Sequence, residues 1–562
     1  MITDTELANI IFPDVTDTLE DLEKKYPERK LPEGAKVTRF APSPTGFLHT
    51  GSLFTSLVSC LIAKQSGGIF YTRLEDTDTK REISGSADEM LELLQEFSVI
   101  PDEGYISENK EIGSYGPYRQ SDRAFIYRIV AKHLMEMGRA YPCFATKEEL
   151  DELRAQQEKE KVNPGYYGKY AKYRDLDTDK ALEYIKEGKP YIIRFKSMGN
   201  QENKVPFHDE IRGDLELTQN DQDIVIIKGD GLPTYHFAHA CDDHFMRTTD
   251  VTRGEEWLSS LPIHLELFDT LGFKRPRYAH FPVIMKEENG NRRKLSKRKD
   301  PEAKVTFFLE EGYPIYGVLE YLITIANSNF EEWRIQNPQP EATSFKLSYE
   351  KMSLDGALFD LEKVKSISKE RIAIRKASIL EQEVEAWAKE YNNEFYQKII
   401  SDRKFITDIL NIEREKDKPR KDYAKYSDIY PIISFFYDDV YNSLNKNEFD
   451  YTVMLNKQES RTVDSNIIKD VMNDYINNYN LDVTEEEWFN NLKTIAEKYK
   501  FTSDIKEYKN NPLNYNGQVG DVAGFIRVML SGRKNTPNIY FVQKILGKDK
   551  VIERIKSCLN IL

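Results

Sequence analysis

The chain has 562 residues, of which 31% are charged and 40% hydrophobic, and a formal net charge of −14 at pH 7. This length exceeds one hydrophobic core, so we expect roughly three to five domains. The sequence lacks both a secretory signal and an apolar run near the ~20 residues of a membrane span, which indicates a cytoplasmic protein without a membrane partner. The scattered cysteines (Cys60, Cys143, Cys241 and Cys558) give no support to a disulfide framework. The acidic charge argues only weakly against nucleic acid, because one basic face can dominate binding.

A strand–helix–strand unit is predicted near the N-terminus. Residues 37–40 read as a short strand, the apolar spacing over 48–64 predicts a helix, and 69–74 form the next strand. This order predicts a parallel sheet with a right-handed crossover. Because ligands bind at the carboxyl ends of such strands, we expect His49 and Glu75 to meet there.

The remaining chain gives a coarser pattern. The sequence predicts helices over roughly 83–138, a mixed region to about 220, and a buried strand at 223–228 that resumes the parallel sheet. From about 310 to the end the pattern is mainly helical. Residues 1–36 are acidic and interrupted by prolines, so we expect an irregular appendage.

Two short stretches carry the chemistry. Arg39–Gly51 (RFAPSPTGFLHTG) places a tight turn, a histidine and small residues at the mouth of a helix. Backbone N–H groups and the helix dipole favour phosphate at such a place. Arg293–Arg298 (RKLSKR) supplies mobile cations for the same anion. Alone, a histidine beside a glycine turn is more often structural and a basic run more often a solvated face. Together they predict a nucleotide site assembled from both halves of an α/β sheet.

The same stretches resemble a known family. Pro44–Gly51 resembles the HIGH element of the class I aminoacyl-tRNA synthetases, and Lys294–Arg298 resembles their KMSKS element. Other segments resemble bacterial-type glutamyl-tRNA synthetase over nearly all of residues 37–370 and again near the C-terminus. These segments are Thr38–Gly46, Arg73–Asp78, Thr234–Ala238, Asp242–His244, Val251–Trp257, Gly517–Val519, Arg527, Gly532–Arg533 and Ile545–Asp549.

The resemblance implies the fold and the domain order. It implies an α/β Rossmann-like class I catalytic domain with an α+β acceptor-binding insertion, followed by all-α stem-contact and anticodon-binding domains. The boundaries we expect are an appendage at 1–36, the two catalytic halves at 37–130 and 221–310, the insertion at 131–220, the stem-contact domain at 311–400 and the anticodon-binding region at 401–562.

The reaction that the resemblance implies is attack of a glutamate carboxylate on the α-phosphate of ATP, followed by transfer to a ribose hydroxyl of tRNA(Glu). Since negative charge grows on the phosphates, fixed donors and cations should accelerate it. The catalytic residues so implied are His49, Gly51, Lys294 and Lys297, and the ATP site adds Ser52, Glu256, Ile284, Ser296 and Arg298. We expect Mg²⁺ to arrive on ATP. We expect no zinc, since Tyr141–Phe144 contains one cysteine and Gly165–Tyr170 none.

Glutamate carries two carboxylates and one ammonium, so its pocket needs two cationic groups and one anionic group. Arg39 and Arg253 are the predicted carboxylate readers, because an arginine fork binds a carboxylate through two parallel bonds, and Glu75 is the predicted ammonium partner. The resemblance places Arg253 at the side-chain carboxylate, where glutamine enzymes lack the positive charge. The full predicted glutamate set is Arg39, Ala41, Ser43, Glu75, Tyr235, His239 and Arg253. Bacterial relatives commonly have asparagine at the place of His239, so a contact and a packing role are equally open there.

Several alternatives stay open at this stage. The enzyme could charge tRNA(Gln) as well as tRNA(Glu), and Arg527 and Arg533 could touch RNA or hold helices. A shorter relative that modifies a tRNA base lacks the anticodon region, and a glutamine-specific enzyme is opposed by Arg253. An inactive RNA-binding paralogue is opposed by the intact His49 and Lys297. We expect a monomer.

We predict that Arg253→Ala loses glutamate-dependent charging far more than ATP binding, because the change removes only the reader of the side-chain carboxylate. Aminoacylation and ATP-binding assays on the same preparation check this. Equal losses, or no loss, would show that the pocket is assigned wrongly.

Overall fold

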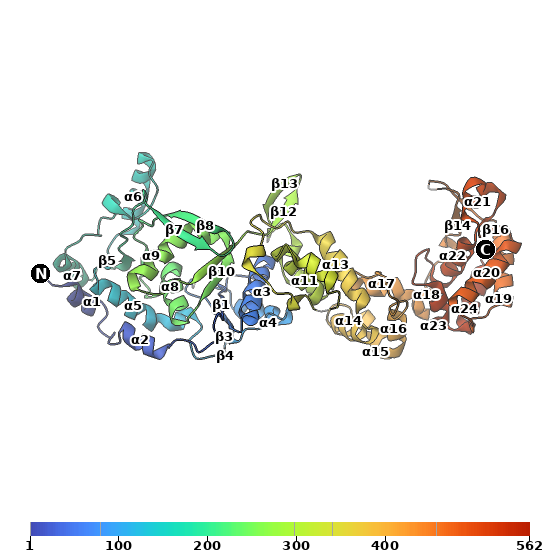
Figure 1. Cartoon of the computed structure of the whole chain (residues 1–562), viewed down its shortest axis with the longest axis horizontal. Coiled ribbons are helices and arrows are strands. Elements are labelled where there is room, and N and C mark those ends of the chain that lie inside the picture. Colours follow the sequence, from blue (N-terminus) through green and yellow to red (C-terminus); the bar gives the residue numbers. More distant parts are fainter. Residues whose placement is uncertain (1, 79, 297, 340, 457) are drawn as a thin grey trace. The chain divides into compact units, whose positions relative to one another are not determined.

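The computed structural model describes residues 2–78, 80–296, 298–339, 341–456 and 458–562. The chain forms two compact units (Figure 1). Unit 1 comprises Met1–Phe308 and Val318–Leu361, and unit 2 comprises Leu309–Gly317 and Glu362–Leu562. The six domains expected from the sequence, with their boundaries, stay predictions.

Unit 1 is built on a parallel sheet in two halves. One half has the order β1 (Val37–Phe40), β2 (Ile69–Thr72) and β3 (Glu103–Ser107), with β4 (Lys110–Ile112) antiparallel at the edge. The other has the order β10 (Asp250–Gly254), β11 (Arg277–Phe281) and β7 (Lys204–Asp209), with β8 (Gly213–Thr218) antiparallel. The Thr249 N–H donates to the Val37 carbonyl at 3.0 Å, so β10 lies beside β1.

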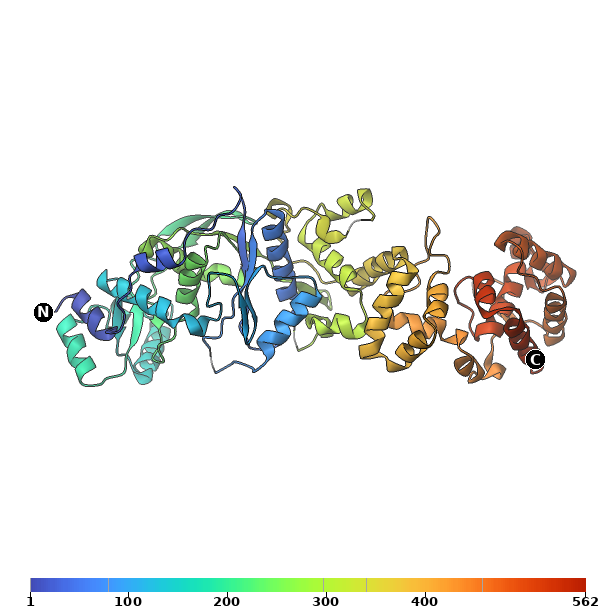
Figure 2. The same ribbon diagram turned by 90° about the horizontal axis from the view of Figure 1, so that it is seen from below.

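The strand order therefore reverses between β1 and β10. Helix α3 (Thr50–Gln65) connects β1 to β2 and packs on both, as the predicted strand–helix–strand unit requires (Figure 2). In the other half of the sheet, helix α8 (Tyr235–Phe245) precedes β10 in the chain. In open α/β sheets, ligands bind at the carboxyl ends of the strands where the order reverses. The parallel sheet predicted from the sequence is confirmed, and the fold places a binding crevice between β1 and β10.

Two predictions about the sheet were wrong in detail. The buried run at 223–228 does form a strand, β9 (Val225–Ile227), but it pairs antiparallel with β6 (Ile192–Phe195), which pairs in turn with β5 (Ala140–Cys143). Strand β10, not β9, resumes the parallel sheet. The predicted helical stretch 83–138 is interrupted by β3 and β4. An apolar run indicates burial, but it does not identify the partner strand.

The N-terminal appendage is not irregular. It contains α1 (Asp4–Ile11) and α2 (Leu19–Lys25), each opened by a capping box, Thr3 with Glu6 and Thr18 with Asp21. Both helices pack on α5 (Ala124–Glu136). Because the capping boxes satisfy the first backbone N–H groups, helices of only two turns persist here between the prolines.

Unit 1 contains further helices and one hairpin. They are α4 (Ser86–Glu96), α6 (Lys147–Glu160), α7 (Thr178–Lys186), α9 (Leu261–Leu271), α10 (Thr306–Glu311), α12 (Phe330–Gln336) and the hairpin β12 (Met285–Glu288) with β13 (Asn291–Lys294). Helices α10, α11 (Ile315–Ala326) and α13 (Leu361–Ile374) each contribute residues to both units. Helices within the described ranges are too short or too polar to cross a bilayer.

Unit 2 is predominantly helical, as the sequence predicts. Its helices are α14 (Ala377–Tyr391), α15 (Asn393–Ser401), α16 (Arg403–Leu410), α17 (Ile429–Ile433), α18 (Asp438–Asn442), α19 (Ser465–Asn477), α20 (Glu485–Lys498), α21 (Ile505–Asn510), α22 (Val519–Ser531), α23 (Ile539–Leu546) and α24 (Lys548–Leu559). Short strand pairs join β14 (Thr452–Met454) to β15 (Ser460–Thr462) and β16 (Phe501–Thr502) to β17 (Gly517–Gln518).

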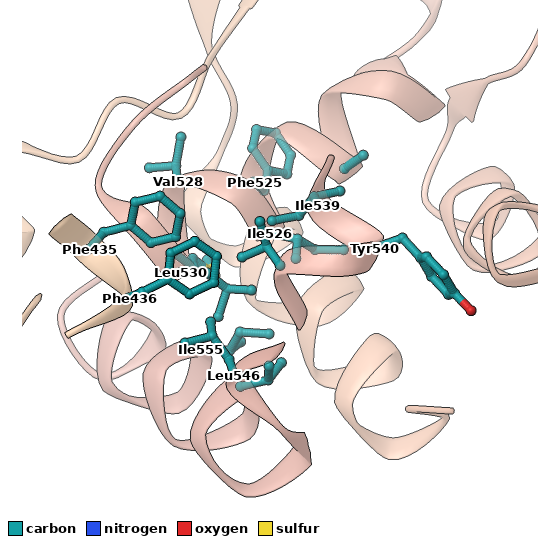
Figure 3. Close-up of a cluster of buried hydrophobic side chains, with 14 of the residues drawn as sticks. Phe435, Phe436, Phe525, Ile526, Val528, Leu530, Ile539, Tyr540, Leu546 and Ile555 are labelled. Atoms are coloured by element: carbon teal, nitrogen blue, oxygen red, sulfur yellow. The ribbon is translucent and has the colours of Figure 1, made fainter. Parts of the chain in front are cut away.

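The core of unit 2 centres on α22. Figure 3 shows Phe436, Ile526, Leu530 and Ile555 gathered in one cluster, and all four are fully buried or nearly so.

We predict that Ile526→Ala destabilises unit 2 by about 2–5 kcal/mol, the usual result of opening a cavity in a packed core. Native-state hydrogen exchange of the α22 amides in the full chain measures this. Leu513→Ala is the control, since Leu513 is 77% exposed. Equal exchange in the two variants would contradict the packing described.

Candidate active site

A cavity of about 600 Å³ opens in unit 1 at the carboxyl ends of β1 and β10. Residues from both predicted sub-sites line it together. The residues predicted for glutamate that line it are Arg39, Ala41, Ser43, Glu75, Tyr235 and Arg253, and those predicted for ATP are His49, Gly51, Ser52, Glu256, Ile284 and Lys294. The fold thus brings segments more than 200 positions apart in the sequence to one crevice.

His49 forms the entrance of helix α3. It is the N-cap residue, and its Nδ1 atom accepts a hydrogen bond from the Gly51 N–H at 3.0 Å. A neutral imidazole that accepts at Nδ1 carries its proton on Nε2 and can donate from there. A Cβ atom at Gly51 would lie 3.2 Å from His49 Nδ1, so the glycine leaves room for this ring. The Gly51 N–H that we expected to face phosphate is engaged by His49.

The basic stretch that begins in β13 contains one cation held by a protein carboxylate and one that lines the cavity. Lys294 lines the cavity with its Nζ atom 3.6 Å from Glu256 Oε1, and both side chains are half-exposed. Arg293 instead donates to both carboxylate oxygens of Asp300, at 2.6 and 2.8 Å. Hydrogen bonds from Arg293 hold the pKa of Asp300 far below its usual range, although burial opposes this. Arg293 therefore fixes the loop and is not a mobile cation as expected.

The other predicted residues of this stretch lie differently. The Ser296 N–H donates to Asp300 Oδ2 at 2.7 Å, and the exposed Arg298 donates its N–H to Ser296 Oγ at 3.4 Å. Neither residue lines the cavity. Lys297 falls outside the described residues. The structure thus describes one lysine of the predicted pair at the cavity.

Behind the cavity, one carboxylate holds two arginines. Asp243 Oδ1 accepts from Arg73 Nη1 at 2.6 Å and from Arg39 Nε at 3.3 Å. Arg73 Nη2 also donates to Glu75 Oε1 at 3.0 Å. Burial raises the pKa of Asp243, but the two guanidinium groups outweigh it and hold this pKa below its ordinary value. Burial also raises the pKa of Glu75 despite Arg73.

Arg253 lies in a different electrostatic setting. It is 5% exposed, and its Nε atom donates to His280 Nε2 at 3.0 Å. Both terminal nitrogens lie 3.4 Å from His264 Nδ1. Within the described ranges no carboxylate lies within 4.0 Å of this guanidinium. Arg253 is therefore a buried cation at the cavity wall whose hydrogen-bond acceptors are neutral rings.

His239 does not line the cavity. Its ring is fully buried, with Nε2 3.0 Å from Tyr278 Oη and Nδ1 3.1 Å from Asp243 Oδ2. Burial, followed by the nearby arginines, holds the pKa of His239 well below its ordinary value. Of the two roles left open by the sequence, this position agrees with packing behind Arg39, whose Nη2 lies 3.4 Å from His239 Nδ1.

Sequence reasoning missed several residues that shape the site. The Trp257 ring lies against the Tyr235 ring, with centroids 4.4 Å apart, and both line the cavity. Asp243 and Arg73 stood in the segments that carried the family resemblance, but we assigned them no role. A buried arginine needs a partner, and that requirement alone would have directed attention to the acidic pair Asp242–Asp243.

The two arginines predicted for tRNA lie in unit 2 and contact protein groups. Arg533 Nη1 donates to the Ile432 carbonyl at 3.2 Å and to the Pro431 carbonyl. Arg527 Nε donates to Thr536 Oγ1 at 3.2 Å. These bonds hold neighbouring segments of unit 2, so contact with RNA stays a prediction. Over the described ranges no three histidine, cysteine or carboxylate side chains are placed to hold a metal.

We predict that Asp243→Asn destabilises unit 1 by about 3–5 kcal/mol, because the buried Arg39 loses the carboxylate it donates to and the buried Arg73 loses one of its carboxylate partners. Chemical denaturation at pH 7 measures the difference. Since the folded-state pKa of Asp243 is lowered, its contribution is complete above the unfolded value of about 3.9 and is lost as the pH falls through the folded value.

The matched control is Asp269→Asn. Asp269 accepts from Arg275 Nε at 2.7 Å, but this pair is exposed, so the expected change is below about 1 kcal/mol. Similar losses in the two variants would mean that the buried network contributes no more than a surface ion pair.

Comparison with known proteins identifies the family. Residues 36–365 match the family described as tRNA synthetases class I (E and Q), catalytic domain, and residues 383–559 match an anticodon binding domain. The glutamate–tRNA ligase of Clostridium perfringens (strain SM101 / Type A) is 48% identical over 553 residues, covering 98% of this chain and 99% of that protein. That of Clostridium beijerinckii is 46% identical and covers 99% of each chain.

A solved structure agrees with these matches. The crystal structure of a glutamate tRNA ligase from Elizabethkingia meningosepticum CCUG26117, in complex with its amino acid, is 26% identical with a TM-score of 0.72 and covers 94% of this chain and 100% of that one. The family and the fold class predicted from the sequence are thereby confirmed. With its Rossmann-like sheet, its cavity at the strand reversal and its helical C-terminal unit, the chain belongs to the glutamate–tRNA ligase family of the class I aminoacyl-tRNA synthetases.

Proposed function

We propose that this enzyme activates L-glutamate with ATP to glutamyl-adenylate and pyrophosphate, and then transfers the glutamyl group to the 3′-terminal ribose of tRNA(Glu), releasing AMP. The observation that carries the proposal is Arg253, a buried guanidinium at the cavity wall without a carboxylate partner among the described residues. A buried cation in this state is a ready partner for the second carboxylate of glutamate.

The rest of the cavity supplies the groups that glutamate needs. Arg39 is held by Asp243 and lines the same cavity, where it can bind the α-carboxylate until that group reacts. Glu75 lines the same cavity and can pair with the ammonium group of glutamate. Because burial raises the pKa of Glu75, a bound ammonium would favour its charged form. The rings of Tyr235 and Trp257 contact each other and also line the cavity.

Glutamine would fit this pocket poorly. Its neutral amide would leave the charge of Arg253 unpaired in a buried site, which costs several kcal/mol, on the order of 3–5. The specificity for a dicarboxylic amino acid therefore rests on charge and not on size. Arg253 is the residue that we assign to this discrimination.

We place the ATP phosphates near the N-terminus of α3. The His49 Nε2–H and the dipole of α3 would stabilise the negative charge that develops on the phosphates, and Lys294 would add a cation on a flexible stem. Ser52, Ile284 and Glu256 line this part of the cavity. We assign Mg²⁺ to ATP, whose phosphates would hold it and whose charge it would neutralise.

We assign recognition of the tRNA anticodon to unit 2. Recognition of unstacked anticodon bases uses aromatic stacking and arginine hydrogen bonds. Arg527 and Arg533 stay candidates for such contacts, although each also donates hydrogen bonds to protein groups. We propose that the enzyme is cytoplasmic and acts as a monomer, and the described residues that line the cavity all come from one chain.

Charging assays test the proposal directly. Purified tRNA(Glu) and tRNA(Gln) transcripts are each incubated with ATP and either glutamate or glutamine. We expect glutamate to be attached to tRNA(Glu) and glutamine to neither tRNA. Attachment of glutamate to tRNA(Gln) as well would identify a non-discriminating enzyme. RNA binding without any charging would overturn the proposal in favour of an inactive paralogue.

A further inference from the structure

Half of the eight histidines in this chain lie around one arginine. His264 and His280 accept hydrogen bonds from Arg253, His236 Nδ1 lies 3.0 Å from His264 Nε2, and the His239 and His264 ring centroids are 4.2 Å apart. Burial holds the pKa of all four rings below the ordinary value, with that of His236 at about 4. The shell around Arg253 is therefore polar and uncharged.

The acceptor role of His280 is fixed from behind. Its Nδ1 atom lies 2.5 Å from Asp209 Oδ2, and both side chains are fully buried. A carboxylate can only accept, so the ring proton stays on Nδ1 and Nε2 keeps its lone pair for Arg253. Asp209, His280 and Arg253 come from the adjacent parallel strands β7, β11 and β10, and Arg253 is the register partner of His280.

We propose that Asp209 and His280 are positioning residues for glutamate selection: Asp209 fixes the tautomer of His280, which orients Arg253 without neutralising it. This inference rests on the proposed function of Arg253. A carboxylate in direct contact with Arg253 would also orient the guanidinium, but it would compete with the substrate carboxylate for the same charge. A neutral acceptor avoids that competition, and Asp209 keeps the acceptor in the required form.

The variant Asp209→Asn tests this arrangement, which we call the relay from Asp209 through His280 to Arg253, because it should reverse the tautomer of His280. Asp209 Oδ1 accepts from the N–H groups of Ile211 and Arg212, both at 3.0 Å, so an asparagine should place its carbonyl there and its NH₂ toward His280. The ring would then accept at Nδ1 and carry its proton on Nε2, where it faces the Arg253 Nε–H. Two donors would meet in a buried site, and the guanidinium would turn away.

The readout is ATP–pyrophosphate exchange in the presence of tRNA, with separate KM values for glutamate and ATP. We expect Asp209→Asn to raise the KM for glutamate about 10- to 100-fold, the range for an unsatisfied buried hydrogen-bonding group, and to leave the KM for ATP within about twofold. Asp214→Asn is the matched control, because Asp214 bonds the exposed His208 on the same sheet at 2.7 Å. That variant should keep both KM values.

His280→Gln separates positioning from structural support. The glutamine amide oxygen can accept from Arg253 whatever residue 209 is, so the double variant Asp209→Asn/His280→Gln should recover about tenfold in the KM for glutamate relative to Asp209→Asn. His280→Leu, which offers no acceptor, should lose glutamate binding as Asp209→Asn does. If Asp209→Asn does not fold, the contrast between His280→Gln and His280→Leu decides the matter alone.

Three results would overturn the inference. They are an unchanged KM for glutamate in Asp209→Asn, equal increases in the KM values for glutamate and ATP, and losses that add in the double variant. Failure of the proposed function is distinct, because the wild-type enzyme would then show no glutamate-dependent exchange. An active wild type with unaffected variants contradicts the relay alone.

Discussion

A buried positive charge at the point where the strand order reverses governs this active site. Arg253 stands at the carboxyl end of β10, beside β1, and among the described residues its hydrogen-bond acceptors in the protein are uncharged. A buried guanidinium needs hydrogen-bond acceptors, and two histidines provide them here, one 3.0 Å from Nε and the other 3.4 Å from each terminal nitrogen. The charge itself stays available to a ligand. The chemistry of the pocket follows from that arrangement.

Arg39, the other arginine of the pocket, differs from Arg253 because a protein carboxylate pairs with it. Arg39 shares the carboxylate of Asp243 with Arg73, so its position is fixed by an ion pair and its charge is partly compensated. A reader of the α-carboxylate, which every amino acid carries, does not need to discriminate by charge. The residue that binds the side-chain carboxylate does need to discriminate by charge. The two environments thus match two different tasks, and both depend on the parallel sheet that brings α8, β10 and β11 together behind one cavity.

Much of this site was visible in the sequence. The strand–helix–strand unit, the two motifs and their order predicted the sheet and the residues that face the cavity, because chain order fixes which strand ends meet. The supporting residues were not predictable in the same way. Asp209 and His280 act through the register between strands far apart in the sequence, and no local spacing marks them. The partner of β9 was missed for the same reason. The helices of the appendage differ, since the pattern Thr3–Glu6 was a readable capping box.

The most direct test of this account is a crystal structure of the enzyme with bound glutamate. We predict that both oxygens of the side-chain carboxylate lie about 2.7–2.9 Å from the Arg253 terminal nitrogens, in a bidentate contact, with His280 still accepting from Nε. A side-chain carboxylate bound elsewhere in the cavity, or an Arg253 guanidinium turned toward a protein carboxylate, would contradict the claim that this buried charge selects the amino acid.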